Sequence, residues 1–287
     1  MGQSKMEVEI QIEDSTNLVK VPVYVNQRGP FAFTFDIGAS TTTLSSQLAE
    51  RLGIQTYDGH KKEAMGVGGG IPTKFAAVDS IAIGSMVFKN EEVYVLNLDL
   101  ALRGCGKHDG VIGHSTLKSC RFSLSYEKQR LKLQEGNSSM GDERREKDWY
   151  PFEYIDNTHL IRAPVYINGR GPFDFVIDTG AGSSVITPEL AKSLNLRTEP
   201  VNGIARGIGG DVKLELVSLD HFSLGSFVQE GMQVAVVDLA SVSPRGRLIE
   251  NGIVGSDILH RLELTVDYPM KQLTFVPEHI SRNSQDT

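Results

Sequence analysis

The feature that most constrains this chain is an internal repeat. Residues 22–39 and 164–181 are identical at 12 of 18 positions, at an offset of 142 residues. Three further blocks repeat in the same order, at offsets of 141 or 142: Gly66–Gly69 with Gly207–Gly210, Ile83–Ser85 with Leu224–Ser226, and Gly110–Gly113 with Gly252–Gly255. Four matching blocks in one order indicate a tandem duplication, so we expect two copies of a fold of about 120 residues.

The boundary between the copies is visible in the composition. Residues 135–148 are polar, rich in glycine and serine at first, and then strongly charged. Such a stretch has little apolar surface to bury and predicts a flexible linker. The expected organisation is an N-terminal lobe over residues 1–134, the linker, and a C-terminal lobe over residues 149–287.

Within each copy the pattern is mostly that of strands. Apolar and polar residues alternate over 6–12, and β-branched and aromatic residues fill 21–25 and 163–167. Two more alternating runs lie between residues 261 and 276. Short helices are predicted over 45–52, ended by Gly53, and over 188–194, with Thr187 as the cap. The predicted class is all-β with a few short helices.

Composition excludes several kinds of partner and site. The 36 acidic and 29 basic residues give a net charge of −7, which argues against nucleic acid. No apolar run approaches the roughly 18 residues that span a bilayer. The seven histidines are scattered, and the two cysteines, Cys105 and Cys120, are most simply free thiols, so no metal site is expected. Without a signal peptide in the chain as given, the default expectation is a cytoplasmic protein, with a removed export signal left open.

One aspartate recurs at the same place in each copy. Asp36 and Asp178 each end a run of apolar strand residues, and each is followed two residues later by a glycine, Gly38 or Gly180. A charged carboxylate in apolar surroundings is costly unless it is paired or used. If the copies pack about a pseudo-two-fold axis, the two loops meet there and the carboxyl groups share a proton. One is then a base and the other an acid, and together they activate water against a carbonyl group.

These motifs resemble the retropepsin-like aspartic protease family, with two retropepsin-type units fused in one chain. The family's apolar strand leading into Asp-Thr-Gly-Ala is complete at residues 178–181, whereas the copy at 36–39 has Ile37 in place of the threonine. Two apolar residues and a glycine before a short helix occur at 111–113 and 253–255, and Asp257 also fits the family pattern. The resemblance covers roughly residues 18–134 and 158–277. It implies two pseudo-two-fold related β-barrel lobes of the acid protease fold.

The same resemblance implies a function. It predicts an aspartic endopeptidase that cuts peptide or protein substrates with a water activated by Asp36 and Asp178, in a cleft between the lobes. The enzyme would act as a single chain and need neither a metal nor an organic cofactor. By position, the glycine-rich segments would be flap tips that close over the substrate. The implied substrate-contacting residues are Gly38, Ala39, Ser40, Thr179, Gly180, Ala181 and Gly182 around the dyad, and Gly68, Gly69, Gly209 and Gly210 in the flaps.

Ile37 and Ser40 predict an asymmetric site. In the family, each threonine of the Asp-Thr-Gly pair bonds the backbone of the opposite loop; Thr179 can do so, but Ile37 has no hydroxyl. Ser40 offers a hydroxyl where Gly182 does not. Ile37 is also the best support for an alternative, a catalytically silent peptide-binding protein. A two-carboxylate glycosidase would need carboxyl groups about 5 Å apart or more, and closer contact is expected here.

Overall fold

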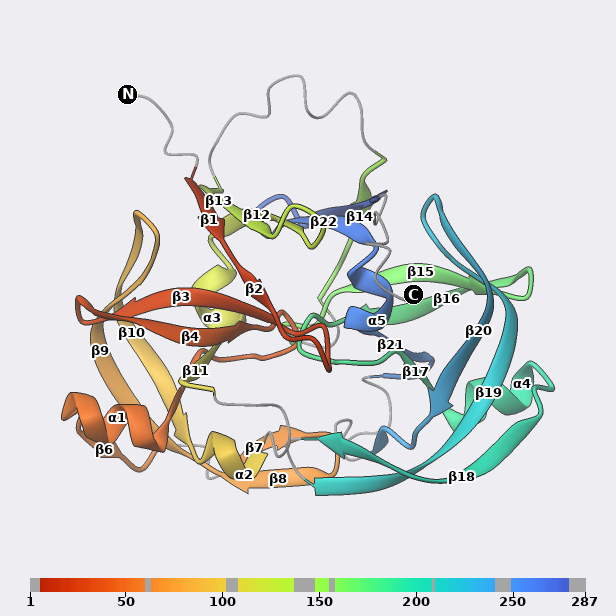
Figure 1. Cartoon of the computed structure of the whole chain (residues 1–287), viewed down its shortest axis with the longest axis horizontal. Coiled ribbons are helices and arrows are strands. Elements are labelled where there is room, and N and C mark those ends of the chain that lie inside the picture. Colours follow the sequence, from red (N-terminus) through yellow and green to blue (C-terminus); the bar gives the residue numbers. More distant parts are fainter. Residues whose placement is uncertain are drawn as a thin grey trace, which may run out of the picture.

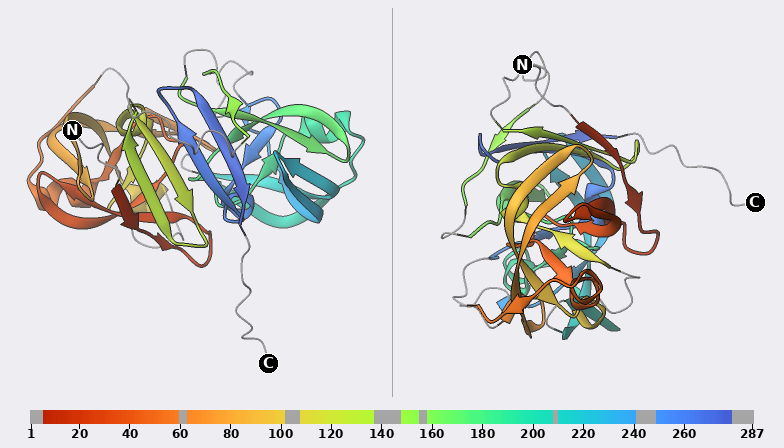
Figure 2. Two further views of the ribbon diagram at one scale, coloured as in Figure 1. Left: turned by 90° about the horizontal axis from the view of Figure 1, so that it is seen from above. Right: turned by 90° about the vertical axis from the view of Figure 1, so that its left-hand side faces the viewer.

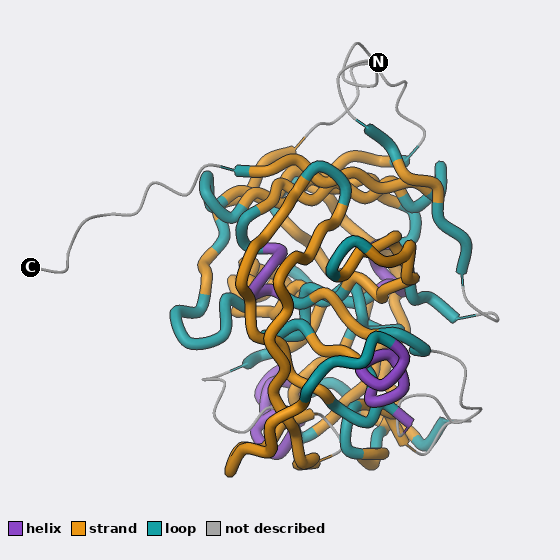
Figure 3. Tube along the Cα trace, turned by 90° about the vertical axis from the view of Figure 1, so that its right-hand side faces the viewer, coloured by secondary structure: helices purple, strands orange, loops and turns teal. Residues whose placement is uncertain are grey.

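The computed structural model describes most of the chain and is built mainly of strands (Figure 3). The prediction of an all-β protein with short helices is confirmed. The described residues are 6–59, 63–101, 108–136, 148–154, 158–207, 210–240 and 249–278. Gly209, Cys105 and residues 137–147, most of the predicted linker, lie outside them.

The first half of the chain forms a closed six-stranded barrel. Its strands, in spatial order, are β3 (Val19–Val25), β4 (Arg28–Phe35), β11 (Gly110–Ile112), β5 (Thr43–Ser45), β10 (Met86–Leu96) and β9 (Lys74–Ile83). β9 pairs again with β3, which closes the barrel. Two short strands extend its edges, β2 (Gln11–Ile12) on β3 and β6 (Thr56–Tyr57) on β9.

The second half repeats this barrel, as the duplication predicts. Its strands, in spatial order, are β15 (Arg162–Ile167), β16 (Arg170–Ile177), β21 (Gly252–Val254), β17 (Val185–Ile186), β20 (Phe227–Val236) and β19 (Gly210–Leu224). β19 closes the barrel on β15 and also carries β18 (Thr198–Gly207). In both barrels the parallel pairs β4–β11 and β16–β21 run beneath the aspartate loops, because Asp36 and Asp178 directly follow β4 and β16.

A third sheet joins the two barrels along one side of the molecule (Figures 1 and 2). Its order is β1 (Met6–Glu9), β13 (Arg130–Glu135), β12 (Cys120–Ser125), β22 (Leu262–Asp267), β23 (Gln272–Pro277) and β14 (Tyr150–Pro151). The central pair, β12 and β22, brings one strand from each half into antiparallel contact. The two halves therefore share a sheet and a continuous apolar core within a single chain.

The helices begin and end close to the predicted positions. α1 (Ser46–Leu52) is capped by the Ser45 side chain, which accepts from the Leu48 N–H, and it ends at Gly53 with a left-handed φ of 70°. α4 (Pro188–Ser193) has Thr187 as its cap. The other helices are single turns: α2 (Leu98–Ala101), α3 (His114–Leu117) and α5 (Ser256–Leu259). No helix in the described ranges is long and apolar enough to cross a membrane.

The glycine-rich segments form hairpins on the side of the molecule opposite the shared sheet (Figure 1). In the first half the hairpin is β7 (Glu63–Gly66) and β8 (Gly69–Pro72), and in the second it is the end of β18 and the start of β19. The two tips touch, because a Cβ added to Gly68 would lie 2.5 Å from the Gly210 nitrogen. Gly68 also has a φ of 89°, which favours glycine.

Candidate active site

Asp36 and Asp178 are held in equivalent loops by their own lobes. The backbone N–H of Asp36 donates to the Ile112 carbonyl of β11 at 3.0 Å, and that of Asp178 donates to the Val254 carbonyl of β21 at the same distance. Each Asp-x-Gly-Ala stretch then folds back on its own carboxylate. Asp36 Oδ1 accepts from the Ala39 N–H at 2.9 Å, and Asp178 Oδ1 accepts from the Gly180 N–H at 2.8 Å.

The structure brings these two carboxyl groups together across the lobe boundary. They lie close enough for the charge of Asp178 to raise the pKa of Asp36. Each also packs on the glycine of the other loop. A Cβ on Gly38 would stand 2.5 Å from both Asp178 oxygens, and a Cβ on Gly180 would stand 2.5 Å from Asp36 Oδ1. Glycine is required at both places because only a loop without side chains lets the carboxyl groups approach this closely.

The electrostatics of the pair are unequal. Burial and the neighbouring carboxyl group of Asp178 raise the pKa of Asp36 well above its ordinary value. Burial also raises the pKa of Asp178, but the Gly180 N–H, the neighbouring Asp36 carboxyl group and the charge of His159 act in the opposite direction. Because the two half-buried carboxyl groups lie side by side, ionisation of one disfavours ionisation of the other.

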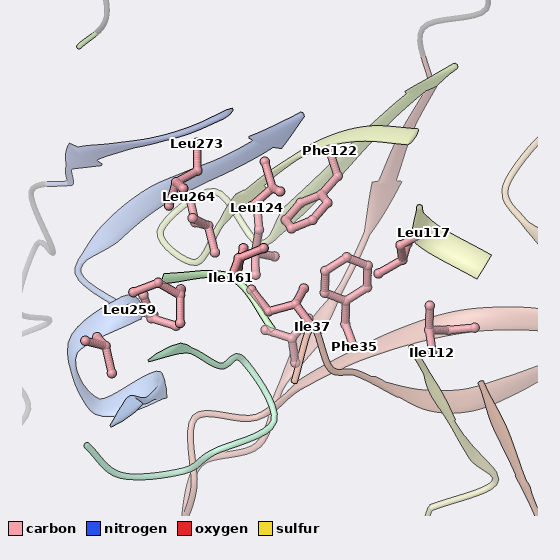
Figure 4. Close-up of a cluster of buried hydrophobic side chains, with 14 of the residues drawn as sticks. Phe35, Ile37, Ile112, Leu117, Phe122, Leu124, Ile161, Leu259, Leu264 and Leu273 are labelled. Carbon is pink, nitrogen blue, oxygen red and sulfur yellow. The ribbon is translucent and has the colours of Figure 1, made fainter. Parts of the chain in front are cut away.

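Thr179 connects the loops with two buried hydrogen bonds. Its hydroxyl donates to the Phe35 carbonyl at 2.7 Å and accepts from the Ile37 N–H at 3.1 Å. Ile37 cannot return these bonds and instead is fully buried in the apolar core, near Ile161 and Leu124 (Figure 4). The asymmetry expected from Ile37 is thus present in the structure, and the loops are still assembled.

Two residues with hydroxyl groups, at matched positions of the two repeats, support the loops by hydrogen bonds. They were not among the site residues predicted from the sequence. Thr42 Oγ1 accepts from the Gly113 N–H at 3.0 Å, and Ser184 Oγ accepts from the Gly255 N–H at the same distance. Asp257 supports Ser184 by accepting from both its N–H and its hydroxyl, at 2.8 and 2.7 Å. Thr42 and Ser184 are 142 residues apart, so the repeat offset was the signal that could have revealed them.

The remaining predicted site residues fall into two groups around the dyad. Ala39, Ser40 and Ala181 accept backbone hydrogen bonds from the starts of α3 and α5, which fixes both loops. A Cβ added to Gly182 would make an ordinary contact with Thr16, at 3.4 Å from its carbonyl oxygen. Gly68, Gly69 and Gly210 lie at the touching hairpin tips, while Gly209 is outside the described residues. Over the described parts of the chain, no group of three His, Cys, Asp or Glu side chains could hold a metal ion.

Comparison with known families agrees with this arrangement. A family model described as "Aspartyl protease" matches the chain twice, at residues 21–116 and 163–258. The chain belongs to the aspartyl protease family. The two matches fall on the two repeats and each contains one of the paired aspartates, so the predicted resemblance to fused retropepsin-type units is confirmed. A search of curated proteins finds no match.

Proposed function

We propose that this protein is an aspartic endopeptidase, in which Asp36 and Asp178 activate a water for attack on a peptide bond. The observation that carries the proposal is the close approach of two half-buried carboxyl groups, one from each repeat, whose pKa values are both raised, so that the pair would share a single proton. Asp178, the more readily ionised of the two, is the base. Asp36, which keeps the proton, is the acid.

The chemistry balances with these two residues alone. The water oxygen attacks the carbonyl carbon while Asp178 takes a proton from the water. At the same time Asp36 gives its proton to the carbonyl oxygen. The resulting tetrahedral intermediate carries two hydroxyl groups. Asp178 then protonates the amide nitrogen, one hydroxyl returns a proton to Asp36, and the carbon–nitrogen bond breaks to release an acid and an amine.

The touching hairpin tips support a peptide as the substrate. We place an extended chain between the tips and the dyad, where the backbone of Gly68, Gly69 and Gly210 on one side and of the aspartate loops on the other would bond it. Ser40 and Gly182 would then line opposite ends, one with a hydroxyl and one without. A glycosidase is disfavoured, because each carboxyl group packs closely on the glycine of the other aspartate loop, whereas glycosidases keep their carboxyl groups about 5 Å or more apart.

The test combines cleavage with inhibitor binding. A denatured casein or a peptide library should be cleaved, and a pepstatin-type inhibitor should block the cleavage. Asp36→Asn and Asp178→Asn should each abolish turnover, and the double variant should be no worse than either, because the pair acts as one unit. Asp174→Asn, at an exposed position in β16, is the control and should cleave normally. Substantial activity in either single variant would refute the dyad.

The same experiment separates the competing proposal, a silent peptide-binding protein that keeps the fold. That protein would bind the inhibitor or a peptide while cleaving nothing in the library. Gain of cleavage on Ile37→Thr would identify Ile37 as the cause of the silence.

A further inference from the structure

One histidine reaches from the second lobe into the aspartate loop of the first. His159 lies in the short segment before β15, and its Nε2 is 2.6 Å from the carbonyl oxygen of Gly38. A carbonyl only accepts, so Nε2 carries the proton and donates. Gly38 is the residue that packs on the Asp178 carboxylate. The hydrogen bond therefore fixes the point at which the first loop meets the second aspartate.

The first repeat has no histidine at the position that matches His159. Thr158-His159-Leu160 corresponds to Thr16-Asn17-Leu18 at the repeat offset of 142. The matching segment lies beside the other loop, because a Cβ on Gly182 would be 3.4 Å from the Thr16 carbonyl oxygen. Asn17 has a neutral side chain that does not titrate near neutral pH. Of these two matched segments, only the one from the second lobe carries a group that can become positively charged.

The surroundings of His159 favour placing that charge on it rather than on its neighbour. The His114 ring of α3 lies 5.8 Å away, and burial, the charge of His159 and Lys118 together lower the pKa of His114 to about 4. His114 also contacts the Tyr154 hydroxyl at 3.2 Å and the Tyr268 ring at 5.2 Å, which are neutral at these pH values. A charge on His159 favours the ionised form of Asp178.

We propose that His159 is a positioning residue that holds the Asp36 loop from the opposite lobe and makes the two aspartates unequal, so that the shared proton resides on Asp36. This inference rests on the proposed function, and it assigns Asp178 as the base and Asp36 as the acid of the peptidase. His159 does not touch the reacting atoms. It acts through the Gly38 carbonyl and through its charge.

The first test is the pH dependence of cleavage. His159→Gln keeps an N–H donor but removes the charge, and we expect near-normal turnover at the optimum with the acidic limb of the pH–rate profile displaced upward. The displacement should be on the order of half a pH unit. His159→Ala removes donor and charge, and kcat should fall about tenfold or more with a smaller change in KM. Asn17→Gln and Asn17→Ala are the matched controls and should leave the acidic limb in place. An acidic limb at the same pH in wild type and both His159 variants would overturn the proposal.

The second test needs no catalytic activity. NMR follows the titration of the histidine rings, and the His159 signal is assigned by its loss in His159→Gln. Because coupling is reciprocal, Asp178→Asn should lower the titration midpoint of His159 by on the order of half a pH unit, whereas Asp36→Asn should lower it less or raise it. Equal midpoints in wild type and Asp178→Asn would overturn the proposal. Coupling in a protein that cleaves nothing would uphold the placement of the proton and refute the peptidase.

Discussion

Thr179 offers the sharpest test of how the two lobes are held together. Its hydroxyl is fully buried and makes both hydrogen bonds between the aspartate loops, to the Phe35 carbonyl and from the Ile37 N–H. Thr179→Val keeps the shape of the side chain and removes only these bonds. We expect the variant to fold, to unfold more easily than the wild type, and to lose activity because the loops are no longer tied.

The size of the effect follows from the two groups left behind. Each buried polar group without a partner costs about 1–3 kcal/mol, so two cost about 2–6 kcal/mol. The extra buried methyl group returns about 0.8 kcal/mol. The net loss in the free energy of unfolding is therefore about 1–5 kcal/mol. A loss near 3 kcal/mol lowers Tm by roughly 6–12 °C in a chain of this size.

Thr274→Val is the matched control within the shared sheet. Thr274 is buried to the same degree, but its hydroxyl has no hydrogen-bond partner in the described structure. Replacing it should leave the free energy of unfolding unchanged or raise it by about 1 kcal/mol. Urea unfolding followed by tryptophan fluorescence, with thermal scans by circular dichroism, measures both variants. Equal stability of Thr179→Val and Thr274→Val would refute the reasoning.

Three further predictions concern pH and assembly. Because the pKa of Asp36 is raised by folding, its contribution to stability is present below its unfolded pKa of about 4 and is lost as the pH rises through the folded value. Asp36→Asn should therefore be more stable than the wild type at pH 7, and the difference should shrink toward pH 4. Urea unfolding at both pH values measures this, and a variant less stable than the wild type at pH 7 would contradict it. Peptide cleavage should extend to about pH 5–7, since Ala39 and Ala181 supply no hydroxyl that would favour ionisation, and a profile confined below about pH 3 would be inconsistent with this. Specific activity should survive dilution to nanomolar protein, because one chain carries both lobes at an effective mutual concentration on the order of millimolar; collapse of activity together with dimers in sizing would show an intermolecular enzyme.

Much of this fold was predictable because the duplication repeats the same sequence motifs in both halves of the chain. The cap at Thr187 and the glycine after Leu52 depend on neighbouring residues only, and local patterns predict them well. The pairing of β12 with β22 is different. Alternation between residues 261 and 276 predicts the strand β22, but it carries no information about which strand of the other half lies alongside.

The candidate site shows the same division. The paired aspartates and their glycines could be recognised because each chemistry-bearing residue lies inside a repeated motif. His159 lies in no such motif and acts on the carbonyl of a residue 121 positions away, so its part appears only when the lobes are seen together. The burial of Ile37 could not be predicted either. A β-branched residue in an aspartate loop is compatible with packing in the core, and it is also compatible with a site that has lost the hydrogen bonds between its loops.

The contacts across the dyad run mainly in one direction. Thr179 and His159, both from the second lobe, bond the Phe35 carbonyl, the Ile37 N–H and the Gly38 carbonyl of the first. The second loop is braced from within its own lobe, where the Ser256 hydroxyl donates to the Thr179 carbonyl at 3.1 Å. In a symmetric homodimer every residue stands on both sides, so replacing the loop threonine by isoleucine would remove all these bonds at once. A fused chain changes one copy alone. Covalent fusion therefore explains how Ile37 can fill the core on one side while Thr179 holds both loops from the other.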